Sequence, residues 1–333
     1  MRGAEGLKKI LVTGGAGYVG SHACKALAQA GYEPIIYDNL STGYIEFVKW
    51  GQFYLGDLLD FQRLRQVFRD EKPVAVMHFA AKSTVAESQS SPHLYYQNNV
   101  AGSLNLLECM REFGVKSMVF SSTCAVYGNS IQTPMMEDHP QLPTSVYGQS
   151  KAMIERMLFD FDRAYGIRSI ILRYFNASGA DPEGDLGESH QPETHLIPVA
   201  LEVALGKRES LELFGEDYPT PDGTCIRDYI HVSDLASAHI LALDQLLKKG
   251  QSQIYNLGTG QGYSVKQVIE CIERVTKKNL KVISSPRRAG DSAILVASAD
   301  RARNELRWRV KYPHLEEHVR HAWSWYLKAT HRS

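Results

Sequence analysis

The stretch KKILVTGGAGYVG, residues 8–20, decides the fold. Its apolar run Lys8–Thr13 has the length and composition of a buried strand, and Gly14, Gly17 and Gly20 follow it. In such a loop the first glycine permits a tight turn, the second lets the backbone approach a diphosphate, and the third allows close packing of helix and strand. Because the next residues recur with a helical period, the stretch predicts a dinucleotide-binding strand–loop–helix unit.

Strands and helices alternate through the first half of the chain. Short apolar runs predict further buried strands at Pro34–Tyr37, Gln52–Leu58, Val74–Phe79, Ser117–Ser121 and Ser169–Tyr174. Helical patterns lie between them, the longest at about Pro92–Phe113 and Tyr147–Tyr165. This order predicts an α/β fold with a Rossmann-type, doubly wound parallel sheet.

The sequence changes character beyond Phe175, where residues 176–193 and 214–228 are rich in turn-forming residues. A helix, a strand and two more helices are expected after them, at residues 230–247, 254–258, 263–277 and 314–328. The first two return to the main sheet, and the others belong to a smaller C-terminal α/β substrate domain. The predicted domains are therefore residues 7–176 with 229–258, and residues 177–228 with 259–333.

Composition excludes several classes of partner. The chain of 333 residues has 37 basic and 37 acidic residues, whereas nucleic acids and anionic membranes need a clustered basic excess. No run of eighteen apolar residues predicts a membrane span, and the first seven residues are too polar for a signal peptide. Five cysteines without a CxxC pair predict reduced thiols and a cytoplasmic protein.

Asp38 ends the second predicted strand, eighteen residues after Gly20. A carboxylate at that place accepts hydrogen bonds from the adenosine ribose and repels a 2′-phosphate. Because its neighbours are Asn39 and Leu40 and not an arginine, NAD is predicted rather than NADP. Asp57, after the third strand, either contacts the adenine or closes an ordinary strand-end turn.

Tyr147 and Lys151 are four residues apart at the start of a predicted helix, so both project from one face. An ammonium near a phenol lowers the pKa of the phenol from about 10 toward neutrality. Thr123, at the end of a neighbouring strand, is placed to hydrogen-bond the reacting oxygen and relay its proton. Such pairs also occur on ordinary surface helices. Together with the dinucleotide loop, this pair predicts a catalytic base.

The chain resembles the UDP-glucose 4-epimerases, sugar-nucleotide epimerases of the extended short-chain dehydrogenase/reductase family. The motifs that carry the resemblance are GGAGYVG, YDNL, HFAA, NNVAG, SSTCAVYG, YGQSK, LRYFNASGA, PTPDGTCIRDYIHV, YNLGTG and PRRAGD. They run from about residue 8 to residue 325. The glycine loop and Tyr-x-x-x-Lys are shared by the superfamily, whereas PTPDGTCIRDYIHV and PRRAGD are much narrower signals.

The resemblance implies a reaction without net redox change. Tyr147 takes the 4-hydroxyl proton with help from Thr123, and hydride moves from C4 to NAD. The 4-keto sugar then presents its other face, so the returning hydride inverts the centre. Lys151 holds the nicotinamide ribose, and a homodimer is implied by the resemblance alone.

The implied ligand contacts form two sets. Contacts to NAD are expected from Gly14, Gly17, Tyr18, Val19, Gly20, Asp38, Asn39, Asp57, Leu58, Phe79, Ala80, Ala81, Asn98, Lys151 and Tyr174. The UDP-sugar is expected at Thr123, Tyr147, Asn176, His195, Leu196, Phe214, Arg227, Arg288, Asp291 and Leu295. Independently of the resemblance, an arginine fork suits a diphosphate, although an ion pair within the protein competes for Arg227.

Three positions depart from the family pattern. Ser83 stands where one branch has lysine, and no role is transferred to Lys82. Leu295 stands at the gate where the branch that excludes N-acetyl groups has tyrosine and the tolerant branch has cysteine or serine. His195 replaces an asparagine beside the glycosyl phosphates. The gate residue leaves UDP-glucose, UDP-GlcNAc and the UDP-pentoses open as substrates.

Other functions fit less well. A sugar-nucleotide dehydratase would carry an acidic residue where Cys124 and Ala125 follow the Ser-Ser-Thr element, and an NAD-sensing regulator would not need both catalytic residues. His314-Leu-Glu-Glu-His318 matches an inverted zinc-protease signature. An amphipathic helix explains that spacing better, and the other histidines form no metal-ligand cluster by sequence, so no metal is predicted.

Overall fold

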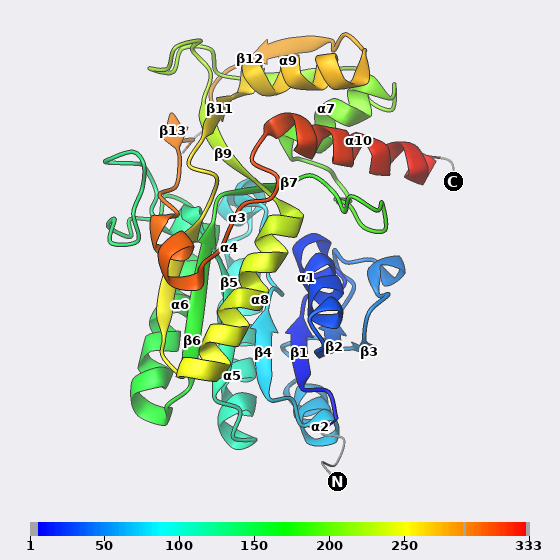
Figure 1. Cartoon of the computed structure of the whole chain (residues 1–333). Coiled ribbons are helices and arrows are strands. Elements are labelled where there is room, and N and C mark those ends of the chain that lie inside the picture. Colours follow the sequence, from blue (N-terminus) through cyan, green and yellow to red (C-terminus); the bar gives the residue numbers. More distant parts are fainter. Residues whose placement is uncertain (1–5, 289–290, 331–333) are drawn as a thin grey trace. The chain divides into compact units, whose positions relative to one another are not determined.

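The computed structural model describes residues 6–288 and 291–330. By the packing of the backbone, the chain divides into two compact units. The first unit contains residues 1–126, 145–173 and 236–255, and the second contains residues 127–144, 174–235 and 256–333. Both units are coloured along the chain in Figure 1.

A seven-stranded sheet forms the centre of the first unit. Its strands, in spatial order, are β10 (Gln253–Leu257), β6 (Arg168–Tyr174), β5 (Ser117–Thr123), β4 (Ala75–His78), β1 (Lys9–Thr13), β2 (Glu33–Asp38) and β3 (Gln52–Leu55). The pairs β1–β2, β2–β3, β1–β4 and β4–β5 are parallel. The predicted α/β fold with a Rossmann-type parallel sheet is thereby confirmed.

Helices cover both faces of this sheet. A buried apolar cluster joins the strands to α2 (Phe61–Glu71), α5 (Gly102–Glu112) and α6 (Val146–Tyr165). Figure 1 shows α1 (Tyr18–Gln29) and α8 (Val232–Lys249) on the opposite face, where Tyr32, just after α1, donates a 2.5 Å hydrogen bond to Asp244 of α8. Two-sided burial explains why the strands read as continuous apolar runs.

The predicted helix from Pro92 to Phe113 is interrupted. The chain forms α4 (Pro92–Tyr95), a π-helical turn at Tyr96–Ala101 and then α5. Asn99 lies in this π-helical turn, and its side chain is fully buried. π-Helical turns inside helices are frequent at functional sites, and a periodic pattern alone does not reveal them.

The second unit is built around β9 (Ile226–His231). This strand pairs with β11 (Gly262–Ser264) antiparallel and with β13 (Ile294–Leu295) and β7 (Asn176–Ser178) in parallel. A second small sheet joins β8 (Leu211–Phe214) to β12 (Val282–Ser285) in parallel. In the apolar core of the second unit, α7 (Leu196–Ala204), α9 (Val265–Thr276) and α10 (Leu315–Thr330) pack together. The sequence reading missed most of these short strands.

The units differ from the predicted domains chiefly at Tyr127–Thr144, which groups with the second unit. The reason is a set of hydrogen bonds inside that unit. The backbone N–H of Met135 donates to the carbonyl of Val296 at 2.8 Å, and the Tyr127 hydroxyl donates to Asn256 at 2.6 Å. The predicted second domain also includes residues 289–290 and 331–333, which lie outside the described residues.

In the described part of the chain, no helix combines the length and the apolar character that crossing a bilayer requires.

Candidate active site

The residues predicted to bind NAD follow the strands of the first unit. The strand order reverses between β1 and β4, and ligands of open α/β sheets bind at such a switch point, outside the carboxyl ends of the strands. The predicted residues stand at those ends: Gly14 after β1, Asp38 closing β2, Asp57 after β3, and Phe79, Ala80 and Ala81 after β4. The predicted catalytic residue Thr123 closes β5 at the same edge.

The glycine loop is packed against its surroundings. Gly14 has a φ of +74°, and a Cβ added there would lie 2.5 Å from the backbone nitrogen of Ala80. A Cβ on Gly20 would lie 2.1 Å from the carbonyl oxygen of Gly14, whereas one on Gly17 would meet that oxygen only at 3.4 Å. The third glycine therefore lets α1 approach the loop itself, and space is free beside the second.

The start of α1 presents backbone N–H groups. Gly17 is its N-cap, and among the described residues no side chain caps the helix. Tyr18 and Val19 form the first helical positions. The backbone N–H groups of a helix start and the positive end of the helix dipole suit a diphosphate. The glycine loop and the helix start that follows it together fit the phosphates of NAD.

Asp38 connects β2 to the glycine loop. Its Oδ2 accepts a 3.0 Å hydrogen bond from the backbone of Ala16, and its Oδ1 accepts one of 2.8 Å from Leu40. Burial raises the pKa of Asp38, while those two N–H groups act to lower it. Sequence reasoning gave Asp38 only a ligand role, and the structure adds that it fixes the loop.

Asp57 and Asn39 lie together at the edge of the sheet. Asp57 accepts a 2.7 Å hydrogen bond from the Asn39 amide and one of 2.8 Å from the backbone of Leu59. The neighbouring Leu58 is buried. The strand-end turn that sequence reasoning considered for Asp57 is therefore present, and its partnership with Asn39 was not foreseen.

Asn99 is a buried residue that sequence reasoning missed. Its Oδ1 accepts hydrogen bonds from the backbone of Lys82 at 2.8 Å and from the predicted ligand Asn98 at 2.9 Å. Its Nδ2 donates to the Lys82 carbonyl and to the Ser150 hydroxyl, both at 3.0 Å. Ser150 in turn donates to the carbonyl of Tyr147 at 2.8 Å. Asn99 thus links the segment after β4 to the first turn of α6.

The three predicted catalytic residues come from β5 and α6. Thr123 is the last residue of β5, and its hydroxyl accepts a 3.1 Å hydrogen bond from the backbone of Ala125. Tyr147 is half-buried in the first turn of α6, whose N-cap Ser145 accepts a 3.1 Å hydrogen bond from Gly148. Lys151 lies one turn further along the helix.

Lys151 is buried, and burial disfavours the charged form of its ammonium group. Its Nζ donates a 2.9 Å hydrogen bond to the carbonyl of Ser121 and lies 4.8 Å from the centre of the Phe120 ring. Burial lowers the pKa of Lys151 to about 7, and the charge of Glu155 acts in the opposite direction. A buried lysine with a lowered pKa, among residues at strand ends, is typical of a functional site.

Sequence reasoning also missed a buried ion pair between Glu155 and Arg173. Glu155 of α6 accepts hydrogen bonds from Arg173 at 2.6 and 3.0 Å and from the Ser122 hydroxyl at 2.6 Å. All three side chains are buried, so each charge and each hydroxyl needs its partner. The network fixes α6 to the ends of β5 and β6. An arginine inside the apolar run SIILRY was the signal available in the sequence.

In the second unit, β9 brings Arg227 to Leu295 and Asp291. Arg227 and Leu295 are register partners of β9 and β13. The guanidinium donates to the carbonyls of Ile226 at 2.9 Å and Ser292 at 2.8 Å, and its Nη2 lies 3.6 Å from the Asp291 carboxylate. The competing ion pair considered for Arg227 is thus present. Three predicted substrate residues are gathered here.

Arg288 and Phe214 form a second contact in this unit. The guanidinium carbon lies 3.9 Å from the centre of the Phe214 ring, at the end of β8. The backbone N–H of Asp291 donates to the Arg288 carbonyl at 3.3 Å. Residues 289 and 290 of the PRRAGD motif lie outside the described residues.

The remaining predicted residues are more dispersed. Asn176 begins β7 and is the register partner of Tyr229, and Leu196 is the first residue of α7. Tyr174 closes β6 and belongs to the second unit, whereas the other predicted NAD ligands belong to the first.

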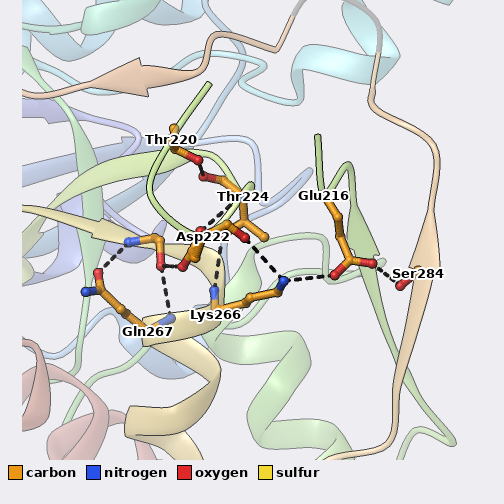
Figure 2. A network of polar contacts seen from close by, with 8 residues as sticks. Glu216, Thr220, Asp222, Thr224, Lys266, Gln267 and Ser284 are labelled. Carbon is orange, nitrogen blue, oxygen red and sulfur yellow. Dashed lines mark hydrogen bonds and ion pairs between the residues drawn. The ribbon is translucent and has the colours of Figure 1, made fainter. Parts of the chain in front are cut away.

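A polar network holds the turn-rich segment before β9 (Figure 2). Asp222 accepts hydrogen bonds from the backbone and hydroxyl of Thr224 at 2.9 and 2.8 Å and pairs with Ser264, the N-cap of α9. Lys266 donates to the Asp222 carbonyl at 3.2 Å and lies 3.0 Å from Glu216. The segment PTPDGTCIRDYIHV is therefore tied to the start of α9, just before Arg227.

His195 has charged neighbours that sequence reasoning did not foresee. Its Nδ1 lies 2.9 Å from Glu188 and 3.3 Å from Glu193, and His190 contacts the same two carboxylates. Although more than half of its side chain is exposed, local desolvation acts to lower the pKa of His195, and Glu188 and Glu193 outweigh it and raise that pKa. No such grouping of the histidines outside the H-x-x-E-H motif was expected from the sequence, whereas ligand atoms of Glu188, His190, Glu193 and His195 lie within 4.8 Å of one another.

The H-x-x-E-H motif does not form a metal site. Both ring nitrogens of His318 have partners, since Nδ1 lies 2.8 Å from the Ser178 hydroxyl and Nε2 lies 2.8 Å from the Tyr312 carbonyl. The buried face of α10 contributes Val319 and Ala322 to the core. The spacing of the motif reflects an amphipathic helix, as the sequence predicts.

Comparison with known proteins agrees with this geometry. The model of the NAD-dependent epimerase/dehydratase family matches residues 10–258. The chain belongs to this family. It is therefore related to enzymes that use NAD, and the prediction of an NAD-dependent epimerase is confirmed at the level of the family.

Within this family, the chain is most informatively compared with individual UDP-glucose 4-epimerases. The chain is 51% identical to the UDP-glucose 4-epimerase of Rhizobium meliloti strain 1021, over 96% of this chain and 97% of the relative. It is 48% identical to the UDP-glucose 4-epimerase of Brucella ovis solved in complex with NAD, with a TM-score of 0.93 and coverage of 95% and 98%. It is 38% identical to the Stenotrophomonas maltophila enzyme with bound NAD and formylated UDP-arabinopyranose, with a TM-score of 0.94 and coverage of 98% and 100%.

Proposed function

We propose that this enzyme interconverts UDP-glucose and UDP-galactose by inverting C4 of the sugar. The observation that carries the proposal is the pair Tyr147 and buried Lys151 at the start of α6, in the same unit as the dinucleotide loop. The names of the relatives support the reaction and the substrate class.

The first unit supplies the binding surface for NAD. We assign the diphosphate to Gly14, Gly17 and the start of α1, and the adenosine to Asp38, Asn39, Asp57 and Leu58. Tyr18, Val19, Gly20, Phe79, Ala80, Ala81, Asn98, Lys151 and Tyr174 complete the set. NAD, when bound, supplies a hydride acceptor that can give the hydride back.

The catalytic side chains transfer the proton of the sugar's 4-hydroxyl group. Tyr147 takes the proton of the 4-hydroxyl and later returns it, and Thr123 hydrogen-bonds the same oxygen. Lys151 stabilises the phenolate by its charge and holds the nicotinamide ribose. Asn99 and Ser150 position Tyr147 by holding the first turn of α6.

The second unit binds the nucleotide. We assign the diphosphate to Arg227 of β9 and to Arg288, which follows β12, and the uridine ribose to Asp291. Asn176, Leu196, Phe214 and His195 contribute further contacts. Arginine forks suit phosphate oxygens better than point charges do.

Leu295 sets the choice of sugar. It is half-buried opposite Arg227, and its size lies between the tyrosine and the cysteine or serine of other branches. UDP-glucose and UDP-galactose are the proposed main pair. UDP-GlcNAc and UDP-xylose remain the alternatives that a substrate panel separates.

We also propose a cytoplasmic homodimer. All five cysteines are free and buried, which fits a reducing compartment. Large apolar side chains are exposed on neighbouring helices: Leu104 on α5, at 43%, and Met153 and Phe159 on α6, at 38% and 41%. Exposed apolar side chains on neighbouring helices support an interface between copies. Light scattering should give twice the mass of the chain, and a monomer at micromolar concentration would contradict the dimer.

The deciding experiment is a panel of UDP-glucose, UDP-GlcNAc and UDP-xylose given to NAD-loaded enzyme, with the products identified. Conversion of UDP-glucose to UDP-galactose without added NAD is expected, because the cofactor ends each cycle as it began. If only the pentose or the N-acetyl sugar reacted, the substrate assignment would be wrong. If none reacted, the epimerase proposal itself would fail.

A further inference from the structure

Two histidines and two glutamates converge in the segment that precedes α7. Glu188, His190, Glu193 and His195 each offer one ligand atom, and these atoms all lie within 4.8 Å of one another. All four belong to the eight-residue stretch ESHQPETH of the second unit. The site is thus complete within one short segment.

The nitrogen–oxygen distances within the cluster are in the range that neighbouring ligands of a metal ion show. The Nδ1 atom of His195 lies 2.9 and 3.3 Å from Glu188 and Glu193, and that of His190 lies 3.6 and 3.4 Å from the same residues. In a tetrahedral zinc site with bonds of about 2.0–2.1 Å, neighbouring ligand atoms are separated by about 3.3–3.4 Å. The four nitrogen–oxygen separations, 2.9 to 3.6 Å, lie near this value, with His190 facing Oε2 and His195 facing Oε1 of Glu193.

The carboxylates are held in place by the protein. Glu188 and Glu193 are buried, and Glu193 accepts hydrogen bonds from the backbone of Thr194 at 2.8 Å and of His195 at 3.0 Å. The side chain of His195 is 55% exposed, so an ion can reach the cluster from solvent. Buried, oriented carboxylates beside an accessible imidazole suit a bound cation.

We propose that Glu188, His190, Glu193 and His195 bind one divalent metal ion of the zinc class. Two imidazoles favour zinc or a similar transition metal over Mg²⁺ or Ca²⁺, which prefer oxygen ligands. Four protein ligands make a closed, structural site. The ion closes the loop and fixes the segment that leads into Leu196 at the start of α7.

A second cluster nearby carries no such proposal. Asp181, Glu183 and Asp185 also bring ligand atoms within 4.8 Å, but they are carboxylates alone. The competing explanation for the His/Glu cluster is an ion pair without metal, in which a protonated His195 bridges the two glutamates. This explanation predicts no metal binding, so the two are separable by experiment.

The test measures metal in protein without an affinity tag, stripped with a chelator, and then titrated with Zn²⁺. We expect about one zinc per chain and a dissociation constant of about 1 μM or tighter. Zinc X-ray absorption should show only nitrogen and oxygen ligands, which excludes the five cysteines. The melting temperature should rise with the concentration of Zn²⁺.

His190→Ala and Glu188→Gln should each reduce zinc to less than about a tenth of an equivalent and abolish the rise in melting temperature. The matched controls are His93→Ala, which removes an exposed histidine elsewhere, and Asp185→Asn in the same loop. Both should bind zinc as the parent protein does. NAD content and circular dichroism verify that each variant is folded.

Two results would overturn the proposal. Stripped parent protein that binds no zinc at 50-fold excess, roughly the excess needed to fill a micromolar site, would favour the metal-free ion pair. Folded His190→Ala protein that keeps its zinc would place the ion elsewhere. Neither result bears on epimerisation, which the substrate panel tests separately.

Discussion

The glycine loop of the first unit and the arginines of the second unit are both assigned to a diphosphate, but they are built differently. The loop uses backbone N–H groups and space left by missing side chains. The second unit uses the side chains of Arg227 and Arg288, held by Ser292 and Phe214. The first design depends on local chain geometry, and the second depends on strand register and on loops brought together from distant parts of the sequence.

This contrast predicts different responses to mutation. Changes in the first unit should affect the bound cofactor, the stability or the chemical step. Changes in the second should alter the apparent affinity for the nucleotide sugar and leave the cofactor in place.

Tyr147→Phe removes the proposed base from the first unit. We expect kcat to fall by about 10²–10⁴-fold, because the proton of the 4-hydroxyl loses its acceptor. NAD content, measured by absorbance of the released cofactor, should be unchanged. Activity within a few-fold of the parent enzyme would show that Tyr147 is not the base.

Gly20→Ala places a methyl group against the Gly14 carbonyl, where 2.1 Å is available. Unfolding by urea should show a loss of about 3 kcal/mol or more, and NAD should be lost with it. Gly17→Ala is the matched control for the fold, because 3.4 Å is available there. It should keep the stability and weaken NAD alone. Equal stability losses in the two variants would contradict the packing argument.

Arg288→Ala should raise KM for UDP-glucose by roughly 10–100-fold, since a hydrogen bond to a charged group contributes about 1.5–3 kcal/mol. NAD content and melting temperature should stay near those of the parent. Arg287→Ala is the neighbouring control, because Arg287 pairs with Asp217 and stacks on Tyr218 instead. If both substitutions raised KM alike, the effect would be a general charge effect and not a contact of Arg288.

Lys151 gives the first unit a pH dependence. Burial lowers its pKa to about 7 from an ordinary value of 10.5, so between these values the unfolded chain holds a proton that the folded NAD-free protein lacks. The free energy of unfolding should therefore rise with pH in that window, by about 1.4 kcal/mol per unit, and should level off below it.

The comparison of parent and Lys151→Met isolates this contribution. Urea unfolding at about pH 7.5, 8.5 and 9.5 should show a rise in the parent relative to the variant. Parallel curves would mean that Lys151 keeps an ordinary pKa in the folded state.

The same contrast explains what could be predicted from the sequence. The main sheet and the glycine loop follow from local patterns, since each apolar run is followed by its own turn and helix. Strand β9 was missed because Arg227, Asp228 and His231 make it look polar. Buried Asp228 is satisfied by backbone N–H groups of Thr259, Gly260 and Ala297, partners that lie far away in the sequence.

The site shows the same limit. Tyr147 and Lys151 are predicted because a helix fixes their spacing. The partners Glu155 and Arg173, or Asn99 and Ser150, come from different elements, so only the folded chain shows which charge or amide meets which. The cluster around His195 has ordinary spacing for a loop, and its convergence depends on the path of the backbone.

The chain passes between the two units five times, and this has a consequence for synthesis on the ribosome. All of the first unit has been made once Tyr255 is translated, but the second unit still lacks β11, α9, β13 and α10 at that moment. Domains generally fold as units as they emerge. The nascent chain therefore holds every residue of its dinucleotide-binding sheet except the end of β10 while much of the second unit is untranslated. The second unit can finish folding only after residues 256–333 have been made.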